Sequence, residues 1–482
     1  MNTTKPLLSL GLVLLVGCGN AKPTTGMDLG FGSVNIFSWW TGTGEADALR
    51  AVLELYQSTY PGTTVRNSAV TGTGALADLD VANGIATGQT PPDTFQLSGS
   101  GGDVTDWTQF VGTPTHPVSP ARNALLPLDD LYTEHGWFSA MPTIITDSLR
   151  AADGHIYMVP VDIHRQNSLF YNKAIFTSCP KVGGGVLTPP TSWKDYLEVT
   201  VPSLEACNVI PLAISGQGWT QNLIWSNVLL GTAGVDFRSK YESGHADLSS
   251  PSTADAVILR ASLGTLYSVL SHVNFGATGS LGWDGAAALL QSTASDRAAM
   301  YIHGDWVKGY FQAKGWHAGI DFAEVPGPGT SGSYLFNFDD FAIPAGSANP
   351  DAAKAFIGVF GSKQGQVAFN SYKGSAPVRN DLDVTLFDTV EQQKIAELND
   401  PKTVLLPLSA NSGDWGNELG CLIPGFRPKA APPTDSVAAK AANDAAVDAM
   451  FTKMAACYQC DQTGVCTSAQ SACYHVTKTC AP

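Results

Sequence analysis

Residues 34–70 read VNIFSWWTGTGEADALRAVLELYQSTYPGTTVRNSAV, and this stretch decides the fold class. The apolar run 34–37 is typical of a buried strand. Residues 45–60 follow a helical pattern that ends at Pro61-Gly62, with an apolar face made of Leu49, Val52, Leu53, Tyr56 and Tyr60. Residues 64–70 then alternate like a second strand, so the stretch predicts a strand–helix–strand unit.

The unit repeats once more along the chain. Residues 78–87 favour a helix, Pro91-Pro92 ends it, and residues 94–97 favour a third strand. This βαβαβ order predicts an α/β fold with mostly parallel sheets flanked by helices. Ligands of such sheets bind beyond the carboxyl ends of the strands. Those ends carry residues 38–40 and 96–98, so we expect both loops to open toward one crevice.

A second α/β region is predicted for residues 161–336, because the chain of 482 residues is too long for one core. Further strands are expected at 157–161, 168–171, 298–303 and 341–343. Further helices are expected at 193–207, 254–271, 352–360 and 430–456.

The N-terminus predicts export. Lys5 precedes an apolar run, residues 7–16, that is too short to span about 30 Å of hydrocarbon. Gly17 before Cys18 favours a lipoprotein signal, with residues 1–18 ending in a lipidated Cys18 and residues 19–33 serving as a tether. The alternative is an ordinary signal peptide in which Cys18 is incidental. We expect a periplasmic or cell-surface protein that meets the membrane only through its lipid.

The charge and the cysteines agree with export. A net charge of −15 argues against nucleic acid or anionic lipid as a partner. Setting Cys18 aside leaves eight cysteines, an even number that favours disulfides. Cys179 and Cys207 are close enough to pair, and the pairing of the rest stays open: Cys421, Cys457, Cys460, Cys466, Cys473 and Cys480. A zinc site at Cys457 and Cys460 is the less favoured alternative. Residues 451–482 are predicted to be a Cys-rich appendix held by bridges.

Catalytic and cofactor signatures are absent from the sequence. There is no Gly-x-Ser-x-Gly elbow, His-Glu-x-x-His motif or Walker loop. The glycines of residues 327–332 precede a strand pattern instead of opening a helix, so they indicate a turn. Four histidines lack metal-ligand spacing: His155, His164, His303 and His317. We therefore expect neither an enzyme nor a cofactor.

Aromatic side chains next to polar ones stand out instead. The pair Trp39-Trp40 lies in a Gly-rich turn that leads to Glu45, and similar groups surround Trp219, Trp283 and Trp306. Two adjacent tryptophans in an extended segment cannot both face a core, because side chains alternate there. A sugar presents a C–H face that stacks on an indole and hydroxyls that bond charged or amide groups. The pattern therefore predicts a sugar site.

Six blocks in order give a family resemblance. The chain resembles family 1 of the extracellular solute-binding proteins, which serve ABC sugar importers, and in particular the glucose- and mannose-type branch. The blocks are 36–40 (IFSWW), 91–96 (PPDTFQ), 159–165 (VPVDIHR), 219–221 (WTQ), 303–306 (HGDW) and 373–375 (KGS).

The resemblance implies a two-lobed periplasmic-binding-protein fold of type II, with the ligand in the interlobe cleft. Lobe one would comprise residues 34–160 and 338–376, and lobe two residues 161–337 and 377–450. Crossovers would lie near 159–163, 334–341 and 374–379. The partners it implies are a small sugar and the permease subunits of an importer, for a protein expected to be a monomer.

It also implies the binding residues. Trp39 or Trp40 would stack on the sugar from lobe one, and Trp283 from lobe two. His164 would lie at the lobe junction, and four residues would bond hydroxyls: Glu45, Gln96, Asp305 and Lys373. Ser98 stands where the branch commonly has histidine, and the spacing from Trp40 to Glu45 is one residue longer than expected, so the sugar stays open.

Two alternatives remain at this point. A glycoside hydrolase would use Glu45 and Asp305 as a carboxylate pair about 5 to 10 Å apart. A binding protein that senses its sugar without importing it would use the C-terminal residues as a docking module.

Overall fold

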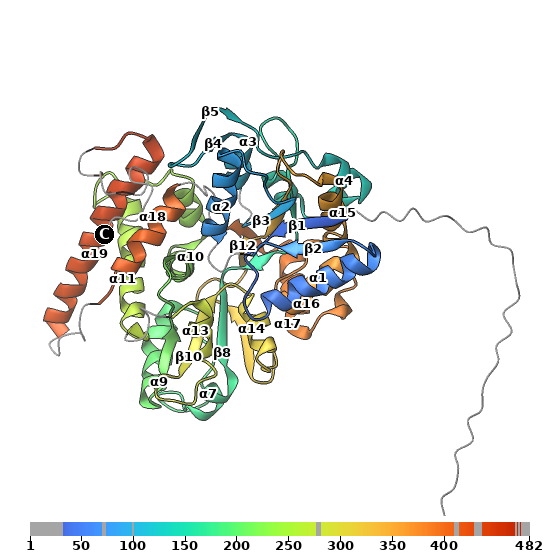
Figure 1. Cartoon of the computed structure of the whole chain (residues 1–482). Helices are drawn as coiled ribbons and strands as arrows, with labels where there is room; N and C mark the ends of the chain where they lie inside the picture. Colours follow the sequence, from blue (N-terminus) through green and yellow to red (C-terminus); the bar gives the residue numbers. More distant parts are fainter. Residues whose placement is uncertain are drawn as a thin grey trace, which may run out of the picture.

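A computed structural model describes residues 32–69, 74–98, 101–275, 281–408, 414–428 and 436–467, together with Gln470 and Cys473 (Figure 1). The predicted signal, Cys18, nearly all of the predicted tether and Cys480 lie outside these residues. Within the described part, every helix is too short or too polar to cross a membrane.

The predicted βαβαβ unit is confirmed. It consists of β1 (Ser33–Phe37), α1 (Glu45–Thr59), β2 (Thr64–Asn67), α2 (Gly74–Ala86) and β3 (Thr94–Leu97). β1 pairs in parallel with both β2 and β3, so it lies between them. All four side chains of β3 are buried, which fits a central strand covered on both faces.

Two strands complete this sheet, whose order is β2-β1-β3-β13-β6. β13 (Asp340–Ala342) is antiparallel to both β3 and β6 (Met158–Pro160). α1 packs against α16 (Lys363–Lys373) and α15 (Pro350–Phe360), as Figure 1 shows beside the sheet. We call the part of the chain that packs on this sheet lobe one.

The second sheet has the order β11-β8-β10-β9 and defines lobe two. β10 (Ala298–His303) is parallel to β9 (Ile210–Ala213) and antiparallel to β8 (Ser168–Asn172). β8 is also antiparallel to β11 (Phe322–Pro326). The expectation of mostly parallel strands therefore holds for β1, β2 and β3 but not for this sheet, because β8 runs against both of its neighbours.

Helices cover both faces of the lobe-two sheet. On one face, a core of buried residues joins the strands to α10 (Gly218–Glu242), α11 (Ala254–Leu270) and α19 (Ser436–Thr463). On the other face, a smaller core includes α13 (Trp283–Ala288) and α14 (Val307–Ala313). Figure 1 shows α11 and α19 side by side, on the far side of the molecule from α1.

Three connections join the lobes. A third sheet, β14-β12-β7, carries them. β7 (His164–Arg165) follows β6 of lobe one, and β12 (Ser333–Asn337) precedes β13. β14 (Val404–Pro407) follows residues that share the lobe-one core and precedes Trp415 of the lobe-two core. β12 is antiparallel to β7 and parallel to β14. Ala376, which bridges to Ile163, still lies in the lobe-one core. The first two connections lie where the resemblance places crossovers.

The predicted boundaries between the lobes stay a prediction, on which one packing detail bears. Phe387, Ile395 and Leu398 were assigned to lobe two, yet they share a buried core with the lobe-one sheet. The last two belong to α17 (Thr389–Asn399).

The remaining elements are α3 (Gly101–Thr108), β4 (Phe110–Gly112), β5 (Pro117–Arg122), α4 (Asp129–Glu134), α5 (Trp137–Ala140), α6 (Thr143–Ser148), α7 (Lys173–Ser178), α8 (Trp193–Asp195), η1 (Tyr196–Thr200), α9 (Val201–Ala206), η2 (Val384–Leu386), α18 (Asp414–Leu422) and η3 (Ile423–Gly425).

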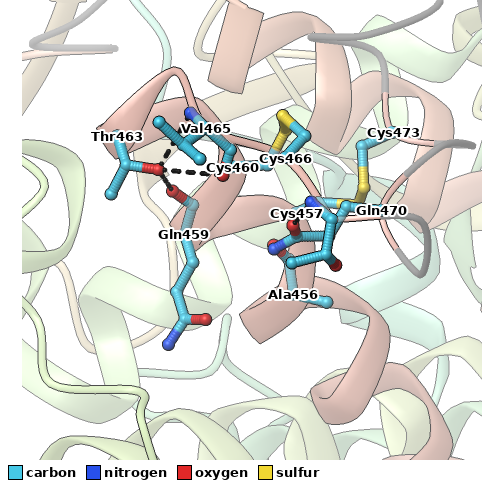
Figure 2. The surroundings of a disulfide bond; sticks show 10 residues. Ala456, Cys457, Gln459, Cys460, Thr463, Val465, Cys466, Gln470 and Cys473 are labelled. Carbon is cyan, nitrogen blue, oxygen red and sulfur yellow. Dashed lines mark hydrogen bonds between the residues drawn. A yellow bond between two sulfur atoms is a disulfide. The ribbon is translucent and has the colours of Figure 1, made fainter.

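Disulfides hold the predicted C-terminal appendix. Cys457 is joined to Cys473 and Cys460 to Cys466 (Figure 2). A third described bond joins Cys179 to Cys207. Cys421 is disulfide-bonded as well. Cys457, Cys460 and Cys473 are buried within the lobe-two core, so this part of the appendix packs into the lobe. The zinc alternative needs the thiolates of Cys457 and Cys460, which this pairing consumes.

Candidate functional site

The tryptophan pair is positioned by one glutamine at the carboxyl edge of the lobe-one sheet. With its amide oxygen toward the indoles, Gln96 accepts hydrogen bonds from Trp39 Nε1 at 3.2 Å and Trp40 Nε1 at 3.0 Å, and its amide nitrogen donates to Ser38 Oγ at 2.7 Å. Ser38 Oγ also accepts from the Trp40 backbone N–H at 3.1 Å. The two predicted loops therefore meet, and Gln96 uses its polar atoms to orient both rings.

The two indoles differ in burial, although both N–H groups reach Gln96. Trp40 is 1% exposed, and its ring lies 4.6 Å from Phe369, 5.8 Å from Phe341 and 6.1 Å from Phe360, measured between centroids. Trp39 is only half-buried and packs against the edge of the same core. Of the predicted pair, Trp39 is thus the ring that retains exposed surface.

Residues from both lobes converge on the turn after Trp40. Glu45, the first residue of α1, accepts a hydrogen bond from Lys373 Nζ at 2.5 Å. A Cβ placed on Gly42 would lie 3.5 Å from Glu45 Oε2 and 4.0 Å from Trp283 Cζ2. Gly44 has φ +86°, and a Cβ there would meet the Gly309 backbone at 2.7 Å. Glycine at position 44 therefore lets the turn approach the backbone of α14 in lobe two, whereas a Cβ at position 42 would make ordinary van der Waals contact with Trp283.

Lys373 completes this corner. Its Nζ lies 5.2 Å from the centroid of Trp40 and 5.7 Å from that of Trp306, so the cation faces two indoles. Burial disfavours its charge, but Glu45 and Asp339 outweigh burial and raise the pKa of Lys373. The ammonium is therefore held in its charged form, as a donor to a hydroxyl or a carboxylate.

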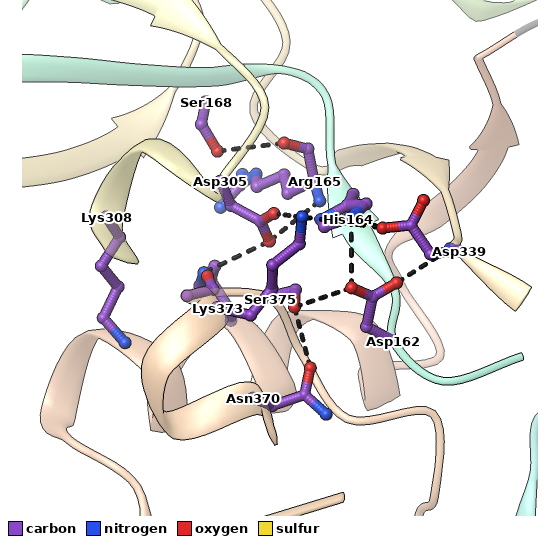
Figure 3. Close-up of polar contacts among 12 residues, drawn as sticks. Asp162, His164, Arg165, Ser168, Asp305, Lys308, Asp339, Asn370, Lys373 and Ser375 are labelled. Carbon is purple, nitrogen blue, oxygen red and sulfur yellow. Dashed lines mark hydrogen bonds and ion pairs between the residues drawn. The ribbon is translucent and has the colours of Figure 1, made fainter. Parts of the chain in front are cut away.

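A buried charge cluster occupies the lobe junction, around His164 (Figure 3). Its Nδ1 lies 2.9 Å from Asp305 Oδ1, and its Nε2 lies 3.0 Å from Asp339 Oδ2 and 3.2 Å from Asp162 Oδ2. Burial opposes a charge on the ring, yet the three carboxylates outweigh burial and raise the pKa of His164 to about 10. The cluster ties the first crossover, which carries Asp162 and His164, to the second, which carries Asp339.

The same cluster could be considered as a metal site, because one ligand atom from each of Asp162, His164 and Asp339 lies within 4.8 Å of the others. A histidine that binds a metal ion must be a neutral imidazole with a free lone pair on the ligating nitrogen. The raised pKa instead makes both nitrogens of His164 donors to carboxylates. The geometry fits an ion cluster that braces the hinge.

Asp305 connects this cluster to lobe two. Its Oδ2 accepts from the Arg165 backbone N–H at 3.0 Å and from Lys394 Nζ at 3.2 Å, while Oδ1 faces His164. Burial would raise the pKa of Asp305, but Lys394 and His164 lower it below its usual value. Glu45 and Asp305 are thus both ion-paired.

Ser98, another residue predicted to bind the sugar, lies directly after β3 and is half-buried.

An aromatic wall lines the carboxyl edge of the lobe-two sheet. His303, the last residue of β10, has ring centroids around it at 4.9 Å for Tyr301 and Trp306, 5.2 Å for Trp219 and 5.9 Å for Trp283. Trp283 was predicted from the sequence as a binding residue, whereas His303 was rejected as a metal ligand and otherwise named only within the 303–306 block, without a role of its own. The signal in the sequence that could have identified His303 is its position at the end of a predicted strand, between aromatic residues.

Complete burial keeps His303 neutral. It is 0% exposed, and burial lowers its pKa to about 3, from an ordinary value of 6.5. Below pH 6.5, His303 is therefore protonated in the unfolded chain but stays neutral in the folded chain.

This difference predicts a pH-dependent stability. When the pH falls from 7 to 5, protonation of His303 in the unfolded chain should lower the free energy of unfolding of the wild type by about 2 kcal/mol. The H303F variant should not show this loss. Urea unfolding of both proteins at the two pH values measures the difference, and the other histidines cancel because both proteins contain them. An equal gap between the proteins at pH 7 and pH 5 would contradict a neutral His303.

Two surface cavities lie away from these residues. One of about 570 Å³ is bordered by α1, α4 and α15, and one of about 760 Å³ lies beside the start of β9. Neither is lined by a residue predicted to bind sugar.

Comparison with known proteins agrees with this architecture. The family model of the bacterial extracellular solute-binding protein matches residues 41–367. An "uncharacterized ABC transporter extracellular-binding protein" of Pyrococcus horikoshii is 30% identical over 381 residues, which cover 78% of this chain and 79% of that protein. A "probable sugar-binding periplasmic protein" of Brucella melitensis is 29% identical over 400 residues, covering 83% and 85% of the two chains.

A solved structure supports the fold. A bacterial solute receptor described as preferring β-D-galactopyranose superposes with a TM-score of 0.66 at 17% identity, over 88% of this chain and 100% of that one. The relatives and this structural neighbour are solute-binding proteins and not enzymes, in agreement with the lack of catalytic motifs. By the match over most of its length, the chain belongs to the bacterial extracellular solute-binding protein family.

Proposed function

We propose that the chain is the substrate-binding component of an ABC sugar importer and holds a glucose-type pyranose between Trp39 of lobe one and Trp283 of lobe two. The observation that carries this proposal is the approach of the two lobes at the Gly42 turn, where Trp283 meets the loop that bears Trp39 and Glu45. The names of the Brucella relative and of the structural neighbour, which both concern sugars, support the ligand class.

Charged groups at the same corner suit hydroxyls. Glu45 and Lys373 pair with each other across 2.5 Å, and a hydroxyl that inserts between them donates to one and accepts from the other. Trp40 and Gln96 then act behind the binding face, because Trp40 lies in the core and Gln96 holds both indoles. Ser98 supplies a small hydroxyl beside them, and Asp305 orients His164 and the hinge.

Transport requires two states of the cleft. The three crossovers form a hinge about which the lobes separate to admit the sugar. The sugar favours the closed state because it contacts both lobes only there, and the permease recognises that state. In this proposal Cys18 anchors the protein, a monomer, to the membrane by its lipid.

A thermal-shift screen tests the proposal. A sugar present at 100 times its Kd should add about 2.7 kcal/mol to the stability and raise the Tm by about 3 °C. The screen uses D-glucose, D-galactose, D-xylose and maltose, with L-alanyl-L-alanine and CaCl2 as controls from other ligand classes. A response to a control with none to the sugars would refute the proposal.

A further inference from the structure

Two side chains at the lobe-two wall, the buried His303 and the half-buried Trp219, have inaccessible ring nitrogens that lack hydrogen bonds of good geometry. Neither Nδ1 nor Nε2 of His303 makes a hydrogen bond of good geometry with the described residues, although the Gly304 backbone lies close to the ring, and Trp219 Nε1 has no partner among these residues. Their rings contact each other, with centroids 5.2 Å apart. A buried polar group without a partner costs free energy, so such groups are rare and point to a missing partner.

The topology places these atoms where a ligand would bind. β9 and β10 are parallel, His303 ends β10, and Trp219 lies in the first turn of α10, after β9. Both residues therefore stand at the carboxyl edge of the lobe-two sheet, which is the edge where such sheets bind ligands.

The two indoles beside His303 reach lobe one. Trp283 approaches Gly42, and Trp306 contacts Lys373 and the His164 ring, whose centroid is 4.7 Å away. His303 thus lies among the indoles that face the Glu45–Lys373 corner.

The surroundings of His303 select its chemical form. The cations of His164 and Lys373 both lie close to Trp306, which contacts His303, and three more aromatic rings surround His303. A second buried cation would be unfavourable here, so the ring is neutral. A neutral imidazole offers one N–H donor and one acceptor, and a hydroxyl can satisfy either.

We propose that His303 is a specificity-determining residue that bonds one hydroxyl of the sugar on its lobe-two side. The inference rests on the proposed function and deepens it. His303 is fixed between four rings, so it accepts a hydroxyl in one configuration and loses the bond with an epimer or a deoxy sugar.

The test uses variants of the full chain and calorimetric titration. Wild-type protein is first titrated with D-glucose, D-galactose, D-xylose and maltose, and the sugar that binds most tightly becomes the probe. H303F keeps a planar ring without nitrogens, and H303Q keeps a donor and an acceptor. H135F is the matched control, because His135 also stacks on a tryptophan, Trp137, but lies exposed in lobe one.

We expect H303F to raise the Kd for the probe at least tenfold, H303Q to raise it less, and H135F to leave it within twofold. One monodeoxy analogue of the probe should bind wild type at least tenfold more weakly than the probe does, yet bind H303F as well as the probe does. A Kd within twofold of wild type for H303F overturns the inference, as does an equal penalty for every deoxy sugar in both proteins.

Two further outcomes are decisive. Failure of wild type to bind any of the four sugars refutes the proposed function, and the role of His303 falls with it. If H303F does not fold, the wild type labelled with 15N-histidine answers the question directly. Saturation with the probe should shift one ring nitrogen of His303, and an unchanged His303 signal at saturation overturns the inference.

Discussion

Replacing Asp305 with alanine should lower the free energy of unfolding by about 3–5 kcal/mol. The carboxylate is fully buried and serves His164, Lys394 and the backbone N–H of Arg165. Its removal leaves two buried cations and one buried donor short of a partner. The loss of a partner from a buried ion cluster is more costly than the net stabilisation that the intact cluster provides.

Urea unfolding at pH 7 measures this loss, with D47A as the matched control. Asp47 also pairs with a cation, Arg50, but both side chains are largely exposed. An exposed pair contributes at most about 1 kcal/mol. Equal losses for D305A and D47A would show that the cluster at the lobe junction is hydrated in solution.

Substitutions of the two adjacent tryptophans should affect different properties: W40A mainly the stability, and W39A mainly sugar binding. W40A should lower the free energy of unfolding by about 3–5 kcal/mol, because its ring fills the core among Phe341, Phe360 and Phe369. W39A should cost less stability, since Trp39 is half-buried, but should weaken sugar binding by about 2 kcal/mol, roughly thirtyfold.

Each variant therefore serves as the control for the other. Thermal unfolding gives the stability, and titration with the sugar found by the thermal-shift screen gives the Kd. The assignment of Trp39 as the stacking residue fails if W39A binds the sugar as wild type does while W40A folds and binds it more weakly.

The sequence predicted the parts of this site that depend on local patterns. The alternation of residues 34–97 predicted β1, α1, β2 and β3, and the rule for carboxyl ends brought Ser38 and Gln96 together. Alternation also required one tryptophan of the pair to leave the core. It did not reveal which one, because the phenylalanines that cover Trp40 lie some 300 residues further along the chain.

Long-range pairing explains the rest of what was missed. Glu45 and Lys373 are separated by 328 positions, so the local sequence around either residue could not predict the ion pair between them. The C-terminal residues look too polar to pack alone, yet Cys457, Cys460 and Cys473 are buried because the core they join belongs to another part of the chain. His303 was judged by metal spacing, whereas its environment is set by four rings from different elements.

The aromatic wall also makes the protein its own optical reporter. The ring centroids of Trp219 and Trp306 lie 6.1 Å apart, and Trp283 approaches the turn after Trp40 at Gly42. Separation of the lobes hydrates some of these indoles and changes their mutual orientation. Their fluorescence emission and near-ultraviolet circular dichroism should therefore follow lobe closure in real time, with no dye attached.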